Sequence, residues 1–232
     1  MSAATKAQAK DKLENFIIKI GYPDKWKDYS GLQVDDSLSL YENMANISEF
    51  FTKDVIARKV NKPVDKTEWG MTPQTINAYY NPTTNEICFP AAILQPPFFD
   101  PTADDAMNYG GIGGVIGHEM SHGFDDQGSQ FDKTGNQNNW STAADKKNFE
   151  SRTKILVDHF NKIELAGKKV NGQMTLGENI GDNGGLNIAF RALQNVMKTE
   201  KLGVKDEFTP EQRFFLAWAR VWAGNARPEY LQ

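Results

Sequence analysis

The sequence predicts a mainly helical domain with a small β-sheet, an α+β fold. Apolar residues recur at helical spacing over most of the chain, while one short region is rich in β-branched and aromatic residues. With 232 residues, 39% of them hydrophobic, the chain is long enough to bury a sizeable core. Prolines and a glycine in residues 63–73 predict a boundary between a helical lead-in, residues 1–62, and a main domain, residues 63–232.

Two helices are expected in the lead-in. Apolar residues from Leu13 to Ile20 follow the i, i+3, i+4, i+7 pattern of one helix face, and Gly21 ends the run. A second apolar stripe with helical spacing runs from Leu40 to Phe51. The solvated side of the first helix is expected to carry three lysines, Lys6, Lys10 and Lys12.

The main domain is predicted to begin with a β-hairpin. Residues 75–80 and 86–89 are rich in β-branched and aromatic residues, and the intervening residues 81–85 have the composition of a turn. The pattern then predicts one helix over residues 108–124, despite its glycines. The glycine run 110–114 lacks the register of a phosphate-binding loop, so close helix packing is the expected reason for it.

Three more helices are predicted from their start signals and apolar stripes. Thr142 with Asp145 three residues later is typical of a capping box, and so is Thr209 with Gln212. Between these two helices, residues 176–197 form the third.

Composition excludes several classes of protein. The 26 Lys and Arg residues against 30 Asp and Glu give a net charge of −4, so nucleic acid is not expected as a partner. The apolar stretches are too short for a transmembrane helix, and the N-terminus lacks the apolar core of a signal peptide. The single cysteine, Cys88, rules out an internal disulfide framework and a Cys-rich zinc module.

Two histidines and a glutamate form the most informative motif, His118-Glu119-Met120-Ser121-His122. Residues four apart on a helix share a face, so both imidazoles can reach one metal ion about 2 Å away. Glu119 lies beside the first histidine, where its carboxylate can reach a metal-bound water without binding the metal. The pattern predicts a catalytic zinc site, which needs a third protein ligand and a position open to water.

A carboxylate is the expected third ligand, and the best candidates are Glu178 and Asp182. These residues are four apart on a predicted helix, so they lie on one face. One could bind zinc while the other accepts the free ring N–H of a ligand histidine. By itself a pair of acids four apart on a helix is more typical of solvated surface residues. The remaining histidine, His159, is predicted to lie on a helix surface.

Several segments are characteristic in combination: Asn77 to Tyr80, Phe89 to Phe99, Asn108 to Gly113, His118 to Asp126, Gly177 to Leu186 and Phe215 to Tyr230. Together with Gly21-Tyr22-Pro23-Asp24 in the lead-in, they resemble the neprilysin family of zinc endopeptidases. The resemblance covers nearly the whole chain. It implies a thermolysin-like zinc metallopeptidase catalytic domain.

The resemblance implies a role for each residue of the motif. His118, His122 and Glu178 would bind one zinc ion per chain. Glu119 would be the catalytic carboxylate, and Asp182 would be the acidic partner of a ligand histidine.

The resemblance also implies how an oligopeptide substrate is held. Asn77 and Ala78 would bind the substrate backbone, which suits an extended peptide that pairs with an edge strand. Four apolar residues would line a pocket beyond the scissile bond, namely Phe98, Phe99, Val115 and Trp222.

Relatives have parts that this sequence does not contain. They supply a histidine and an arginine for the oxyanion shortly after the segment that ends at Tyr230, and Asp125 matches the acid that orients that histidine. The large N-terminal helical domain of relatives is also almost wholly absent. The chain is therefore expected to be a fragment whose partners include the missing parts, and loss of one oxyanion donor lowers turnover by about 10²–10³-fold.

The leading hypothesis is a zinc-dependent endopeptidase that hydrolyses oligopeptides by a metal-activated water, with Glu119 as general base. The alternative is a non-catalytic fragment that keeps the zinc site and binds a peptide or another ligand. A purely structural zinc site would need four protein ligands and would not explain Glu119. Family members are mostly ectoenzymes or exported proteins, so an extracytoplasmic location is expected.

Overall fold

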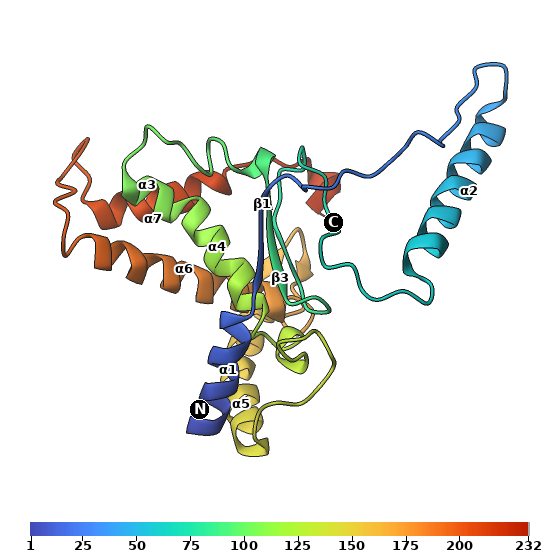
Figure 1. The fold of residues 1–232 in the computed structure, drawn as a ribbon. Coiled ribbons are helices and arrows are strands. Elements are labelled where there is room, and N and C mark those ends of the chain that lie inside the picture. Colours follow the sequence, from blue (N-terminus) through green and yellow to red (C-terminus); the bar gives the residue numbers. More distant parts are fainter. Residues whose placement is uncertain (232) are drawn as a thin grey trace. The chain divides into compact units, whose positions relative to one another are not determined.

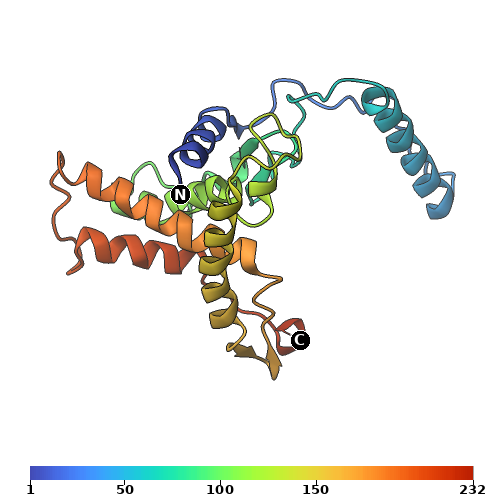
Figure 2. The ribbon, with the colours of Figure 1, turned by 90° about the horizontal axis from the view of Figure 1, so that it is seen from below.

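The computed structural model describes residues 1–231 (Figures 1 and 2). Contacts divide the chain into two units. Residues 1–22 and 71–232 form the larger unit, and residues 23–70 form the smaller one. Residues 1–22 thus pack with the main domain. From the proline-rich boundary near residue 63 we expected them to belong to the lead-in.

The smaller unit consists of one long helix and the segments that flank it. Helix α2 (Leu40–Lys59) begins at Ser39, which forms a complete capping box with Glu42. On this helix Phe50 and Phe51 contact the ring of Tyr29, which precedes the helix in the chain. The helix predicted from the stripe over residues 40–51 is therefore confirmed.

A three-stranded sheet with the order β1-β3-β2 lies in the larger unit. Strands β2 (Tyr79–Asn81) and β3 (Glu86–Pro90) are antiparallel and form the predicted hairpin, although the first strand begins four residues later than expected. Strand β1 (Ile17–Gly21) pairs with β3 in parallel. The order leaves β2 at an edge of the sheet.

The prediction of a helix through Ile20 is wrong. Helix α1 (Ala3–Glu14) ends before the isoleucines, which form β1 instead. Ile17, Ile18 and Ile20 are β-branched and suit a strand, and their hydrogen-bonding partner β3 lies about 70 residues away in the chain. The apolar pattern of this segment therefore matched a helix by coincidence. The expectation that Lys12 lies on a solvated face is also wrong, because the side chain is 2% exposed.

The predicted helix over residues 108–124 is interrupted at Gly111. Helix α3 (Asp105–Gly110) ends there and α4 (Ile112–His122) begins. A Cβ atom at Gly111 would lie 2.3 Å from the carbonyl oxygen of Phe98, so this close approach requires a glycine. The carbonyl of Phe98 accepts a hydrogen bond from Ile112 N at 2.7 Å, which replaces a bond within the helix.

The remaining helices agree with the predictions: α5 (Ala143–Phe160), α6 (Leu176–Val196) and α7 (Pro210–Val221). Thr209 and Gln212 form the predicted capping box. Thr142 caps α5 by accepting a hydrogen bond from Asp145 N, but the Asp145 carboxylate accepts from Ser2 instead of closing the box. The shorter elements are η1 (Ala91–Ile93), η2 (Gly128–Gln130), β4 (Glu164–Leu165), β5 (Lys168–Lys169) and η3 (Pro228–Leu231).

Two apolar clusters hold the larger unit together. Ile87 and Phe89 of β3 pack with Ile112 of α4 in one cluster, which covers the sheet face next to that helix. Phe214 of α7 packs with Leu193 of α6 in the other, and these two helices lie side by side in both views (Figures 1 and 2). Among residues 1–231, no helix combines the length and the apolar character that crossing a bilayer requires.

Candidate metal centre

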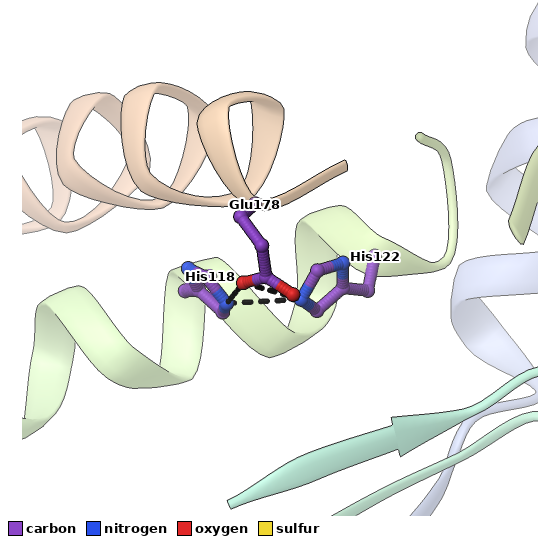
Figure 3. A group of neighbouring side chains, drawn as sticks. All are labelled: His118, His122 and Glu178. Carbon is purple, nitrogen blue, oxygen red and sulfur yellow. Dashed lines mark hydrogen bonds and ion pairs between the residues drawn. The ribbon is translucent and has the colours of Figure 1, made fainter. Parts of the chain in front are cut away.

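Three candidate ligands converge from two helices. His118 and His122 lie on one face of α4, and Glu178 in the first turn of α6 points between them (Figure 3). One ligand atom from each residue lies within 4.8 Å of the other two. The two Nε2 atoms are 2.9 Å apart, and Glu178 Oε2 is 3.3 Å from His118 Nε2 and 3.8 Å from His122 Nε2.

Each histidine is oriented by a carboxylate on its other ring nitrogen. His118 Nδ1 donates to Asp182 Oδ1 at 2.8 Å, and His122 Nδ1 donates to Asp125 Oδ2 at 2.8 Å. Of Glu178 and Asp182, the structure therefore places Glu178 among the ligand atoms and Asp182 behind a histidine. Asp125 was expected to orient a histidine outside this sequence, but here it contacts His122. Its position three residues after His122 is the signal that could have revealed this pairing.

The arrangement of donor atoms fits a zinc ion. With Nδ1 of each ring donating to a carboxylate, each imidazole in its neutral form offers the lone pair of Nε2 on the side of Glu178. Three electron-pair donors this close repel one another unless a cation lies among them. Ligands about 2.1 Å from a tetrahedral zinc are about 3.4 Å apart, close to the separations found here. Two imidazoles and one carboxylate are also a ligand set of catalytic zinc sites.

Glycines allow the two helices to approach closely enough to form the site. A Cβ atom at Gly117 of α4 would lie 2.5 Å from the carbonyl oxygen of Gly185 on α6. A Cβ atom at Gly181 would lie 2.9 Å from the ring of His118. These glycines are therefore required where α4 passes α6, because any larger residue would push Glu178 away from the histidines.

Glu119 lies beside the ligands without joining them. It is 6% exposed and accepts a hydrogen bond from the backbone amide of Tyr80 on β2. Burial raises the pKa of Glu119, because removal from water penalises the carboxylate more than His118 and His122 stabilise it. A buried carboxylate with a raised pKa next to a metal site is suited to proton transfer.

The site opens into a cleft of about 720 Å³. The predicted substrate-binding residues Asn77 and Ala78 line it, directly before the edge strand β2. Sequence reasoning did not identify five further lining residues, although they lie in turns or in η2, next to predicted site elements: Pro82, Gln127, Gly128, Gln173 and Met174. None of the residues that line the cleft in the described part of the chain is Lys or Arg.

The four apolar residues expected in a substrate pocket do not line this cleft. Phe98, Phe99 and Val115 are partly buried and pack against the cluster around Ile87. Trp222 follows the last residue of α7 and is 64% exposed. Their role in substrate binding stays a prediction.

We expect zinc affinity to fall at least tenfold as the pH is lowered from about 8 to about 6. Burial lowers the pKa of His122, but its hydrogen bond to Asp125 and the nearby charges of Glu119 and Glu178 raise it more, so the net shift is upward. A raised pKa means that protons occupy His122 at higher pH, where zinc must displace them.

Competition with a metal indicator at several pH values measures this effect. In the variant Asp125→Asn the loss of the carboxylate charge lowers the pKa of His122, so the fall in affinity should begin at a lower pH. Equal zinc affinity at both ends of the range would contradict protonation of the histidines as the competing reaction.

Comparison with known proteins identifies the family of the chain. The family model of peptidase family M13 matches residues 77–232. The chain is 41% identical to neprilysin-11 of Caenorhabditis elegans over 98% of its own length, and 40% identical to human endothelin-converting enzyme 1 over 99%. It covers 28% and 31% of those two proteins. The chain thus spans about a third of the curated relatives it matches.

Solved structures agree with these matches. The inhibitor complex of the zinc metalloprotease Zmp1 of Mycobacterium tuberculosis superposes with a TM-score of 0.91 at 48% identity, covering 96% of this chain and 35% of that one. PepO from Lactobacillus rhamnosis gives a TM-score of 0.87 at 37% identity, covering 99% and 35%. With the family model matching more than half of its length, the chain belongs to peptidase family M13, the neprilysin and endothelin-converting enzyme family of zinc metalloproteases.

Proposed function

We propose that this chain carries the zinc centre of an endopeptidase that hydrolyses oligopeptides, with Glu119 as the general base. The observation that carries the proposal is the convergence of His118, His122 and Glu178 beside a buried carboxylate that is not itself a ligand. A structural metal site has no use for such a base. Membership in a metallopeptidase family agrees with this chemistry.

Each residue of the site has a defined task in the proposed reaction. His118, His122 and Glu178 would hold one zinc ion, while Asp182 and Asp125 keep the histidine rings in the ligating tautomer. Bound zinc supplies a Lewis acid that polarises the scissile carbonyl and lowers the pKa of water. Glu119 would take the proton of the attacking water and deliver it to the departing amine.

The edge of the sheet provides a binding mode for the substrate. Tyr79 and Tyr80 of β2 line the cleft, and β2 is an outer strand in the order β1-β3-β2. An extended peptide can add to such an edge through main-chain hydrogen bonds. Asn77 and Ala78, just before β2, would bind the substrate backbone next to the scissile bond.

One observation favours the second candidate, peptide binding without turnover. The lining of the cleft in the described residues includes no Lys or Arg, so no cationic side chain there supplements the metal in stabilising an oxyanion. The chain would then bind peptides at the zinc centre and cleave them slowly or not at all.

The extracytoplasmic location expected from the family resemblance stays a prediction.

We expect the chain to contain one zinc ion and its cleavage of an internally quenched oligopeptide to be abolished by a zinc chelator. Chelation removes the Lewis acid on which the reaction depends, so zinc added to the metal-free protein should restore the rate. Elemental analysis gives the metal content, and fluorescence gives the initial rate. An uncleavable peptide, followed by fluorescence anisotropy, separates the two candidates because only binding would remain.

Two outcomes decide against the endopeptidase. Cleavage that persists in fully metal-free protein would exclude a zinc-dependent reaction. Zinc-dependent peptide binding without cleavage would select the second candidate instead.

A further inference from the structure

One lysine from the N-terminal helix is buried next to the metal helix. Lys12 of α1 is 2% exposed, and its Nζ atom donates to three backbone carbonyls, those of Gly123, Gly128 and Phe131, each at 2.7 Å. Burial lowers the pKa of Lys12, and the charges of Asp125 and Asp132 oppose this effect only in part. The resulting pKa is about 8. At pH 7 the side chain is therefore still an ammonium group, with one donor for each carbonyl.

The three carbonyls belong to the segment that follows the metal helix, residues 123–131. This segment contains Asp125, whose Oδ2 accepts from His122 Nδ1. The other oxygen, Asp125 Oδ1, accepts from Gln127 N at 2.8 Å and from Gly128 N at 2.6 Å. Gly128 thus donates to Asp125 while its carbonyl accepts from Lys12, so one residue joins the lysine to the acid that orients a ligand.

Aromatic rings around the ammonium also connect Lys12 to Glu119, the proposed general base. Lys12 Nζ lies 5.6 Å from the ring centre of Phe124, 5.7 Å from that of Tyr80 and 5.9 Å from that of Trp140. Tyr80 is the residue whose backbone amide hydrogen-bonds Glu119. The lysine therefore contacts both the segment behind His122 and the strand beside Glu119.

We propose that Lys12 is a positioning residue of the metal centre, which holds residues 123–131 so that Asp125 keeps the His122 ring in its ligating orientation. The proposal rests on the zinc site proposed above. It assigns a role to the N-terminal helix, which contributes no ligand and no base. The Asp125 carboxylate can orient the His122 ring only if the backbone of Asp125 is itself held in place. Here the ammonium group of Lys12 holds that backbone segment.

The test compares two buried cations by replacing each with Met. Arg213 of α7 is 5% exposed and also donates to backbone carbonyls, those of Leu202, Gly203 and Phe208, but none of these belongs to the metal centre. We expect Lys12→Met to weaken zinc binding about tenfold or more and to change the absorption spectrum of the cobalt-substituted protein. Arg213→Met should lower thermal stability but leave both the zinc affinity and the spectrum unchanged.

A double-mutant cycle with Asp125→Ala tests whether the lysine acts through that acid. If it does, Lys12→Met should weaken zinc binding little further in the Asp125→Ala background. Full additivity of the two effects, or a zinc affinity of Lys12→Met within twofold of the unaltered chain, would overturn the proposal.

Two further outcomes are also decisive. Should Lys12→Met fail to fold, Lys12→Arg keeps the charge but changes the donor directions, so a changed cobalt spectrum supports the proposal and an unchanged one contradicts it. An unaltered chain that binds no zinc would contradict both the proposed function and this inference. If the unaltered chain and Lys12→Met bind zinc equally tightly, only the inference is contradicted.

Discussion

Replacement of Glu119 by Gln is expected to lower peptide hydrolysis by about 10²–10⁴-fold while the chain keeps its zinc. The glutamine has nearly the same shape and can still accept the hydrogen bond from Tyr80, but it cannot take a proton from water. Glu119 is not among the three converging ligands, so the metal should stay. Initial rates and zinc content measured on the same sample separate the two properties.

Glu86→Gln is a matched control for the removal of a buried carboxylate. Glu86 is 2% exposed and is paired with Lys19 at 2.8 Å, but it does not line the cleft. This control should lower the free energy of unfolding and leave the rate of the folded protein unchanged. Hydrolysis by Glu119→Gln within tenfold of the unaltered chain would rule out the proposed base, and loss of zinc from that variant would identify Glu119 as a ligand.

The parts of the site that depend on local spacing could be predicted from the sequence. His118 and His122 are four apart on one helix, so their side chains share a face wherever that helix lies. The same holds for Glu178 and Asp182 on α6. The resemblance to the neprilysin family then paired the two helices, and the family match confirms that resemblance.

The parts that depend on distant partners could not be predicted in this way. Ile17 to Ile20 form a strand because β3 offers hydrogen bonds to them, and no local pattern reports that partner. Lys12 looks like a surface lysine because charged residues, Lys10, Asp11 and Glu14, surround it in the sequence. Its burial follows from three carbonyls more than 110 residues away. The break at Gly111 depends in the same way on the approach of the Phe98 backbone.

Glu178→Ala should weaken zinc binding by about 10²–10³-fold and abolish hydrolysis. Structural zinc sites with four ligands bind with about 10–16 kcal/mol, or about 2.5–4 kcal/mol per ligand, and each 1.4 kcal/mol corresponds to a tenfold change in affinity. The side chain of Glu178 is 72% exposed, so its removal leaves no buried cavity and should not unfold the metal-free protein. Competition titration gives the affinity, and circular dichroism of the metal-free protein checks the fold.

Asp182→Asn, one turn further along α6, is the matched comparison. Asp182 contacts Nδ1 of His118 instead of the metal position, so its loss should weaken zinc binding by about 10–100-fold, less than the loss of Glu178. The order of the two effects distinguishes a ligand from a residue that orients a ligand. If Glu178→Ala binds zinc as tightly as the unaltered chain, the third ligand must be another residue and the proposed centre is wrong. If Asp182→Asn has the larger effect, the roles of the two acids are exchanged.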